Sequence, residues 1–75
     1  MKPNTVLNSL KVHSSKLVNG KAEMYWNENA SAWTVRQWEG KDYHILYRGD
    51  NLKAALICLH DKLHYEEAIK RGYKF

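Results

Sequence analysis

Apolar and polar residues alternate through the middle of the chain, in segments that turn signals separate. These segments are rich in aromatic and β-branched side chains, which fit the pleated surface of a sheet. Asn19-Gly20 is typical of a two-residue type I′ hairpin turn, because such a turn needs positive φ angles. Glu39-Gly40-Lys41-Asp42 marks a second turn. The predicted strands are residues 21–27, 32–39 and 42–48.

The segment before the first turn fits two structures. Val6, Leu10 and Leu17 have the spacing of a helical face, whereas Leu10, Val12 and the turn that follows fit a strand. We predict a strand at about residues 9–18, with a helix as the alternative within residues 5–18.

After Gly49 the period of the apolar residues changes to that of a helix. The apolar stripe consists of Leu52, Ala55, Leu56, Leu59 and Leu63. Asp50 or Asn51 can cap the first turn by accepting a hydrogen bond from an unpaired amide. Apolar residues resume in a different phase at Ala68 and Ile69, which indicates a bend or a second short helical turn.

One helix is therefore predicted over about residues 51–71. Together with the strands it predicts an α+β fold, an antiparallel three- to four-stranded β-meander packed by one C-terminal amphipathic helix. Neither face of the predicted strands is purely polar, so alternation does not say which face the helix covers. A domain of this size needs two of its three tryptophans in the core, and we expect these to be Trp26 and Trp33, with Trp38 exposed.

Composition bounds the class of protein. With 75 residues and 8.8 kDa, the chain forms one small domain, residues 1–75, whose thin core suits binding better than catalysis. Twelve Lys and Arg against eight Asp and Glu give a formal net charge of +4, compatible with nucleic-acid binding and with an ordinary surface. Cys58 is the one cysteine, and no signal-peptide pattern or long apolar run is present. We therefore expect a soluble, cytoplasmic protein with no membrane partner.

No residue pattern predicts catalysis. His60 and His64 have the i, i+4 spacing of H-E-x-x-H zinc proteases, but Asp61 replaces the glutamate and no third ligand is evident. We expect a helix face with half-exposed histidines. Cys58 lies beside the apolar stripe without a histidine positioned to activate it, which favours a small buried hydrophobe. The prediction is a protein that is not an enzyme and has no metal site and no cofactor.

The predicted sheet carries aromatic and cationic side chains together. Guanidinium groups can pair with guanine or phosphate, asparagine amides can pair with adenine, and flat rings can stack on sugars or bases. The candidates for nucleic-acid contact are Tyr25, Asn27, Asn29, Arg36, Trp38 and Arg48. Trp, Tyr and Arg also anchor protein interfaces, so several of these residues suit a protein partner as well.

Short motifs follow one another between residues 22 and 64. They are Tyr25-Trp26-Asn27, Ala32-Trp33-Thr34-Val35-Arg36, Gly40-Lys41, Gly49-Asp50 and Lys53-Ala54-Ala55-Leu56. This succession resembles the AP2-type DNA-binding domain, a family that includes the arm-binding domains of phage integrases and modules of homing endonucleases. The resemblance implies a three-stranded antiparallel sheet that lies in the DNA major groove and is backed by the helix.

The resemblance also implies roles for individual residues. Trp33 matches the family's core tryptophan, and Glu23 departs from a first strand that is normally arginine-rich. The DNA-facing positions correspond to Tyr25, Asn27, Thr34, Arg36 and Trp38. We predict binding to double-stranded DNA through the sheet, with Arg36 and Arg48 as the principal contacts. The alternative is a protein-interaction module, such as a small phage- or mobile-element-encoded regulator or inhibitor of a host protein, or a homodimer.

Overall fold

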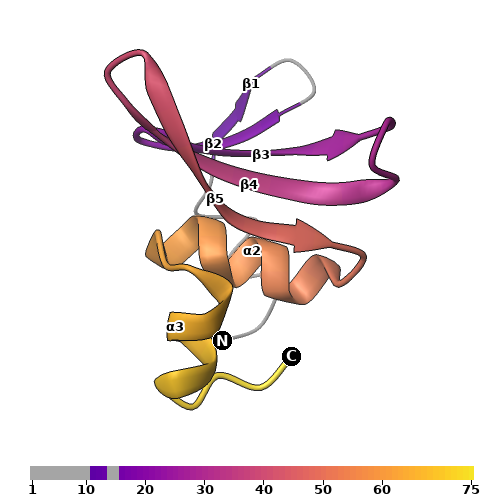
Figure 1. Cartoon of the computed structure of the whole chain (residues 1–75), viewed down its shortest axis with the longest axis vertical. Helices are drawn as coiled ribbons and strands as arrows, with labels where there is room; N and C mark the ends of the chain where they lie inside the picture. The colour runs from indigo at the N-terminus through magenta and orange to yellow at the C-terminus, as the bar shows by residue number, and fades with distance from the viewer. Residues whose placement is uncertain (1–10, 14–15) are drawn as a thin grey trace.

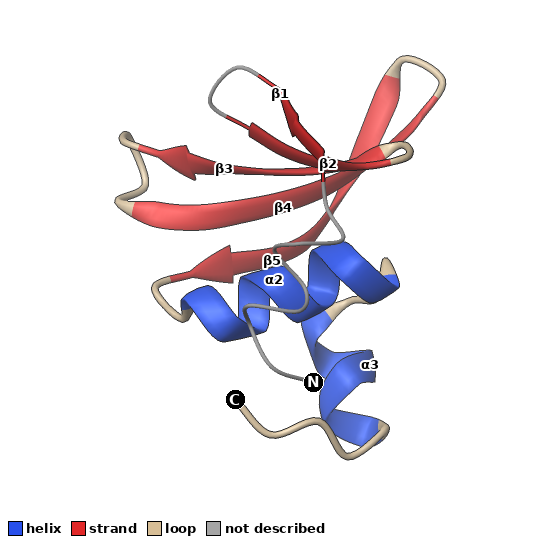
Figure 2. Ribbon diagram, turned by 180° about the vertical axis from the view of Figure 1, so that it is seen from behind, coloured by secondary structure: helices blue, strands red, loops and turns tan. Residues whose placement is uncertain are grey.

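The sheet has five antiparallel strands in the order of the chain, β1-β2-β3-β4-β5 (Figure 1). The computed structural model describes residues 11–13 and 16–75, with side chains from Lys16 onward. The strands are β1 (Lys11–His13), β2 (Lys16–Asn19), β3 (Ala22–Asn27), β4 (Ala32–Glu39) and β5 (Asp42–Gly49). The helices are α2 (Leu52–Asp61) and α3 (Tyr65–Lys70), and both lie on the same side of the sheet (Figure 2). The α+β meander is confirmed.

Two predicted boundaries were wrong. The single strand at 9–18 is replaced by β1 and β2, which pair antiparallel with Val12 opposite Leu17. Residues 9–10 and 14–15 of that prediction, and residues 5–10 and 14–15 of the alternative helix within 5–18, lie outside the described residues. The three strands that follow agree with prediction to within one residue. The sheet thus has five strands where three or four were expected.

The single helix predicted over residues 51–71 is divided in two. Lys62 adopts a left-handed conformation with φ of 55°, which ends α2, and the Leu63 amide donates to the Cys58 carbonyl at 3.1 Å. A left-handed residue cannot continue an α-helix, so the change of phase at Ala68 reflects a new helix axis. The start was predicted correctly, because Asn51 caps α2 by accepting from the Ala54 amide at 3.1 Å.

Both hairpin turns have a glycine followed by a lysine. Asn19 pairs with Ala22, so the two loop residues are Gly20 and Lys21 rather than the predicted Asn19-Gly20. Only Gly20, at φ 62°, has a positive φ, which is the pattern of a type II′ turn and not of type I′. Because Asn19 remains in the strand, its side chain is available to donate to the carbonyls of Leu59 (3.0 Å) and His60 (2.7 Å) at the end of α2.

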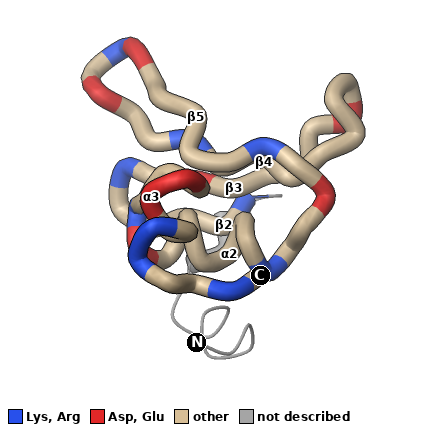
Figure 3. Tube along the Cα trace, turned by 60° about the horizontal axis from the view of Figure 1, so that its bottom comes forward, with Lys and Arg blue, Asp and Glu red and all other residues tan. Residues whose placement is uncertain are grey.

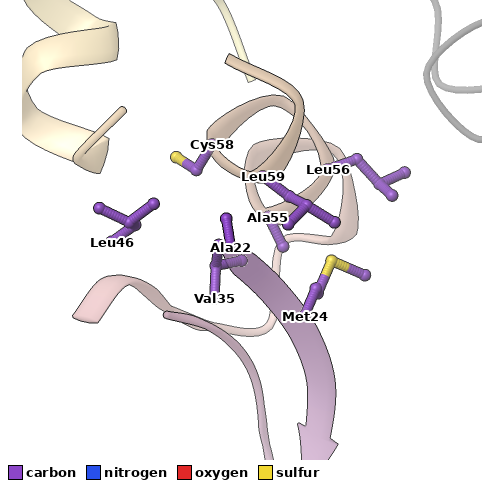
Figure 4. Close-up of a cluster of buried hydrophobic side chains, with 8 residues drawn as sticks. All are labelled: Ala22, Met24, Val35, Leu46, Ala55, Leu56, Cys58 and Leu59. Carbon is purple, nitrogen blue, oxygen red and sulfur yellow. The ribbon is translucent and has the colours of Figure 1, made fainter. Parts of the chain in front are cut away.

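Helix α2 packs across the middle of the sheet. The sheet contributes Ala22, Met24, Val35 and Leu46 to the core, and α2 contributes Ala55, Leu56, Cys58 and Leu59 (Figure 4). The small residues at the centre allow the helix to approach the strands closely, and full burial of each leucine stabilises the fold by about 1.5–3 kcal/mol. The face covered by α2, undecided from sequence, is therefore the face of Met24 and Val35.

The tryptophan predictions were partly wrong. Trp33 packs against the core as expected, but Trp26 is 45% exposed and Trp38 is half-buried. Trp26 is on the same face as Met24 but lies near the end of β3, where it meets Trp33 edge-on with ring centroids 5.1 Å apart. Period-2 alternation predicts the face of a residue, while its burial depends on how far along the strand the helix reaches.

Candidate functional site

The sheet face opposite α2 gathers most of the side chains predicted to bind. Tyr25 pairs with Thr34 and Thr34 pairs with Arg48, so these residues share one face, together with Arg36 and Trp38 two and four positions along β4. We call this face the outer face. The residues of this face whose side chains are described include Lys16, Val18, Glu23, Tyr25, Thr34, Arg36, Trp38, Tyr43, Ile45 and Arg48.

Two of the predicted residues already form hydrogen bonds within the protein. The Asn27 side-chain oxygen accepts the Ala30 amide at 3.2 Å and so stabilises the β3–β4 turn. Thr34 is fully buried, and its hydroxyl accepts from Nε of Arg48 at 3.4 Å. Asparagine readily forms such a local bond to the backbone, and threonine can accept from a cross-strand partner, so sequence alone does not distinguish these uses from ligand binding.

Arg36 lies at the centre of the outer face, surrounded by aromatic rings. Its guanidinium carbon is 4.8 Å from the ring centroid of Tyr25, 4.9 Å from that of Trp38 and 5.2 Å from that of Tyr43. The rings of Trp38 and Tyr43 meet edge-on at 5.0 Å, which fixes one wall of this arrangement. A cation this close to three rings is attracted to their π faces. Tyr43 was missed from sequence, although its cross-strand pairing with Trp38 follows from a two-residue β4–β5 turn.

Glu23 pairs with Arg36 and is the second residue that sequence reasoning missed. Its Oε1 accepts from Nε of Arg36 at 2.5 Å and from the Trp38 indole at 3.1 Å, and its Oε2 lies 3.3 Å from Nζ of Lys16. Burial alone raises the pKa of Glu23, but the hydrogen bonds from Trp38 and Arg36 and the Arg36 charge outweigh it and lower the pKa. We name Glu23, Tyr25, Arg36, Trp38 and Tyr43 the Arg36 cluster.

The charge of the outer face is modest. Among its residues whose side chains the structure describes, it carries three cations, Lys16, Arg36 and Arg48, and one carboxylate, that of Glu23. Two of the three cations contact that carboxylate, and the side chain of Arg36 is only 18% exposed. Lys and Arg elsewhere are spread over several elements rather than gathered on one side (Figure 3).

The two histidines of the zinc-protease spacing do not share a helix face. His60 is in α2, whereas His64 precedes α3, because the chain turns at Lys62. His60 Nδ1 lies 2.8 Å from Asp61, whose other oxygen accepts the Tyr73 hydroxyl. Within residues 11–13 and 16–75, no group of three or more His, Cys, Asp or Glu side chains could hold a metal.

Cys58 has the environment of a structural residue. It is fully buried in the core, and burial, with a smaller effect from Asp61, raises its pKa to about 11. The thiol is therefore protonated at neutral pH and is a poor nucleophile. The sequence interpretation of Cys58 as a small hydrophobe is confirmed.

A groove of about 630 Å³ lies between the outer edge of β5 and the start of α3. It is lined by Ile45, Leu46, Tyr47, Arg48, His64, Tyr65 and Glu66. Strand β5 has a bulge here, because Arg36 pairs with Ile45 and Val35 with Tyr47, which leaves Leu46 unpaired and buried. A bulge bends an edge strand and opposes the addition of another strand, so the outer face is the stronger candidate site.

Helices α2 and α3 have 10 and 6 residues, and no helix in the described part of the chain is long and apolar enough to cross a membrane.

Neither a protein-family model, nor a curated protein, nor a solved structure matches this chain. The likeness to AP2-type domains therefore depends on the residues of this sequence.

Proposed function

We propose that this protein is a non-catalytic binding module whose outer face docks on a partner protein. The observation that carries the proposal is the Arg36 cluster, in which three aromatic rings surround one arginine whose charge Glu23 compensates. Trp, Tyr and Arg are the residues that dominate binding energy at protein interfaces. The centres of such interfaces are poor in unpaired charge, as this cluster is.

The cluster is also pre-organised. Trp38 is held by its indole hydrogen bond to Glu23 and by its edge contact with Tyr43, and Arg36 is held by Glu23 at 2.5 Å. All of these side chains stand on paired strands. Ordering a flexible side chain on binding costs about 0.5–1.5 kcal/mol, so side chains that are already fixed favour affinity.

Charge favours a protein over DNA as the partner. Affinity for DNA comes largely from cations that neutralise phosphates, and proteins that bind tightly use on the order of 6–10 of these contacts. Among residues from Lys16 onward, the outer face offers three cations, of which Lys16 and Arg36 already contact Glu23. Tyr43, in contrast, is 47% exposed beside the cluster and presents apolar area to a partner.

Double-stranded DNA is the second candidate, on one specific observation. Tyr25, Arg36, Trp38 and Arg48 share the sheet face opposite a helix, which is the arrangement that the AP2-type resemblance implies for DNA contact. Arg48 is exposed, and among the residues that the structure describes its hydrogen bond is the one from Nε to Thr34. In this reading Arg36→Ala weakens duplex affinity by ~1–3 kcal/mol if the side chain reads a base.

Photo-crosslinking in cells of the source organism tests the proposal. The photoreactive residue p-benzoylphenylalanine replaces Tyr43 on the outer face, and in a control protein it replaces Ile69 of α3, which has nearly the same exposure (47% against 48%). We expect a discrete protein adduct from position 43 that position 69 does not give. Adducts with DNA support the second candidate, and adducts with a second copy of the chain identify a homodimer. Identical or absent adducts at both positions reject the outer face as an interface.

A further inference from the structure

We infer that the Arg36 cluster is a subsite for a carboxylate, supplied by an acidic segment of the partner protein. This inference rests on the proposed function, since it names the chemical group that the outer face would recognise. It concerns the two terminal amino groups of Arg36, which the cluster itself leaves available.

The hydrogen bonding of Arg36 is incomplete in a specific way. Its Nε donates to Glu23, while neither terminal amino group has a hydrogen-bond partner within the described residues. No buried side-chain nitrogen or oxygen there lacks a partner, so these amino groups reach solvent. Two adjacent N–H groups at the end of a guanidinium match the two oxygens of a carboxylate and bind them in parallel.

The rings of the cluster strengthen that contact. The ring centroids of Tyr25, Trp38 and Tyr43 lie 4.8–5.2 Å from the guanidinium carbon, and the Arg36 side chain as a whole is 18% exposed. An ion pair in such a partly dry site is stronger than an exposed one, because fewer water molecules screen it. Glu23 holds the guanidinium in place, so little side-chain entropy is lost when a carboxylate arrives.

The charge balance matches an acidic peptide. Within the Arg36 cluster the charges of Arg36 and Glu23 cancel, and the neighbouring Lys16 and Arg48 add two positive charges beside it. Three rings face the guanidinium of Arg36, and the cation of Lys16 contacts the other oxygen of Glu23. This environment of Arg36 suits a single carboxylate between apolar side chains better than a row of phosphates, because each phosphate needs its own cation.

NMR titration of the ¹⁵N-labelled full chain tests the inference. Two reporters are built into the cluster, the Nε–H of Arg36 and the indole N–H of Trp38, which both donate to Glu23. The probes are a short glutamate–serine peptide, its glutamine–serine counterpart and a short DNA duplex. We expect the glutamate peptide to shift both reporters saturably, the glutamine peptide to leave them unchanged, and the duplex to bind more weakly than the glutamate peptide.

Two variants and a matched control make the test specific. Arg36→Gln removes one positive charge and the pair of terminal amino groups that would bind the carboxylate, and we expect peptide affinity to fall by about tenfold or more. Lys53→Gln removes one positive charge from an exposed position of α2, away from the outer face, and we expect peptide affinity to change by less than about twofold. Glu23→Gln keeps an oxygen that accepts from Arg36 but removes a competing negative charge, so we expect affinity to rise by roughly three- to tenfold.

Equal losses in Arg36→Gln and Lys53→Gln would mean that the peptide responds to net charge only, and would overturn the inference. Tighter binding of the duplex would overturn it in favour of phosphate recognition. If Arg36→Gln does not fold, Glu23→Gln decides alone, because unchanged or weaker peptide affinity contradicts the subsite. A protein adduct from position 43 together with no effect of Glu23→Gln on peptide binding leaves the proposed function intact and removes this inference alone.

Discussion

Glu23 is the residue whose removal most directly tests the arrangement of the outer face. Its side chain is only 13% exposed, and its carboxylate accepts from Arg36 and Trp38 while contacting Lys16. Glu23→Ala leaves the half-buried guanidinium without its counter-charge and the indole N–H without its acceptor. Both losses destabilise the folded state, because a buried donor that loses its partner is not compensated by water.

The magnitude follows from the individual contacts. A hydrogen bond to a charged group contributes ~1.5–3 kcal/mol, and two such bonds are lost, those from Arg36 and Trp38. The Lys16 contact, with a side chain that is 39% exposed, adds ~0–1 kcal/mol. Removing the carboxylate also removes the cost of burying it, so we expect a net loss of about 2–3 kcal/mol in the free energy of unfolding. In a domain of this length that lowers Tm by on the order of 10–20 °C.

Urea denaturation followed by tryptophan fluorescence measures this loss, with Glu39→Ala as the matched control. Glu39 also pairs across a hairpin, at 3.0 Å from His44, but both side chains are exposed (68% and 55%). We expect Glu39→Ala to cost less than about 1 kcal/mol. A double-mutant cycle of Glu23→Gln with Arg36→Gln should give a coupling free energy of about 1 kcal/mol or more. Equal costs for Glu23→Ala and Glu39→Ala, or a coupling near zero, would refute the argument that the Glu23–Arg36 pair is a buried, mutually dependent unit.

Three further predictions follow from other parts of the molecule. The pKa of Glu23 in the folded state lies below its ordinary value of 4.5. Its contribution to the free energy of unfolding is therefore fully present above pH 4.5 and is lost as the pH falls through the folded-state pKa. We expect the stability difference between the unsubstituted protein and Glu23→Gln to shrink in urea titrations below pH 4.5. A Cβ at Gly49 would lie 2.8 Å from Cζ of Tyr47, closer than ordinary contact. We therefore expect Gly49→Ala to lower the free energy of unfolding by about 1–3 kcal/mol. An unchanged urea midpoint would show that the Tyr47 ring moves aside freely. Cys58, fully buried with a pKa of about 11, should react with a thiol reagent at neutral pH only after urea unfolds the chain, and rapid labelling of the native protein would contradict that placement.

Local patterns in the sequence predicted the elements whose cause is itself local. The alternation in residues 32–39 and 42–48 and the glycine of each turn predict strands β4 and β5 and their hairpin, because the pleat and the turn each depend on a few neighbouring residues. The stripe from Ala55 to Leu59 predicts α2 for the same reason. The prediction failed at Lys62, a residue type that ordinarily continues a helix, because its left-handed conformation is needed to bring α3 back beside α2.

Sequence by itself thus determined the class of fold, the strands from β3 onward, the start of α2 and the structural role of Cys58. Only the tertiary structure decided which sheet face α2 covers and how each side chain of the outer face is used. From the sequence, Arg36 would be taken for an unpaired cation. In the structure Glu23, thirteen positions earlier, is its cross-strand partner, and Tyr43 is the third aromatic side chain beside it. The physical reason is that the alternation along a strand determines to which face a side chain points, whereas the register between strands determines its neighbours. Those neighbours determine whether a charge is free to bind a partner or is already paired.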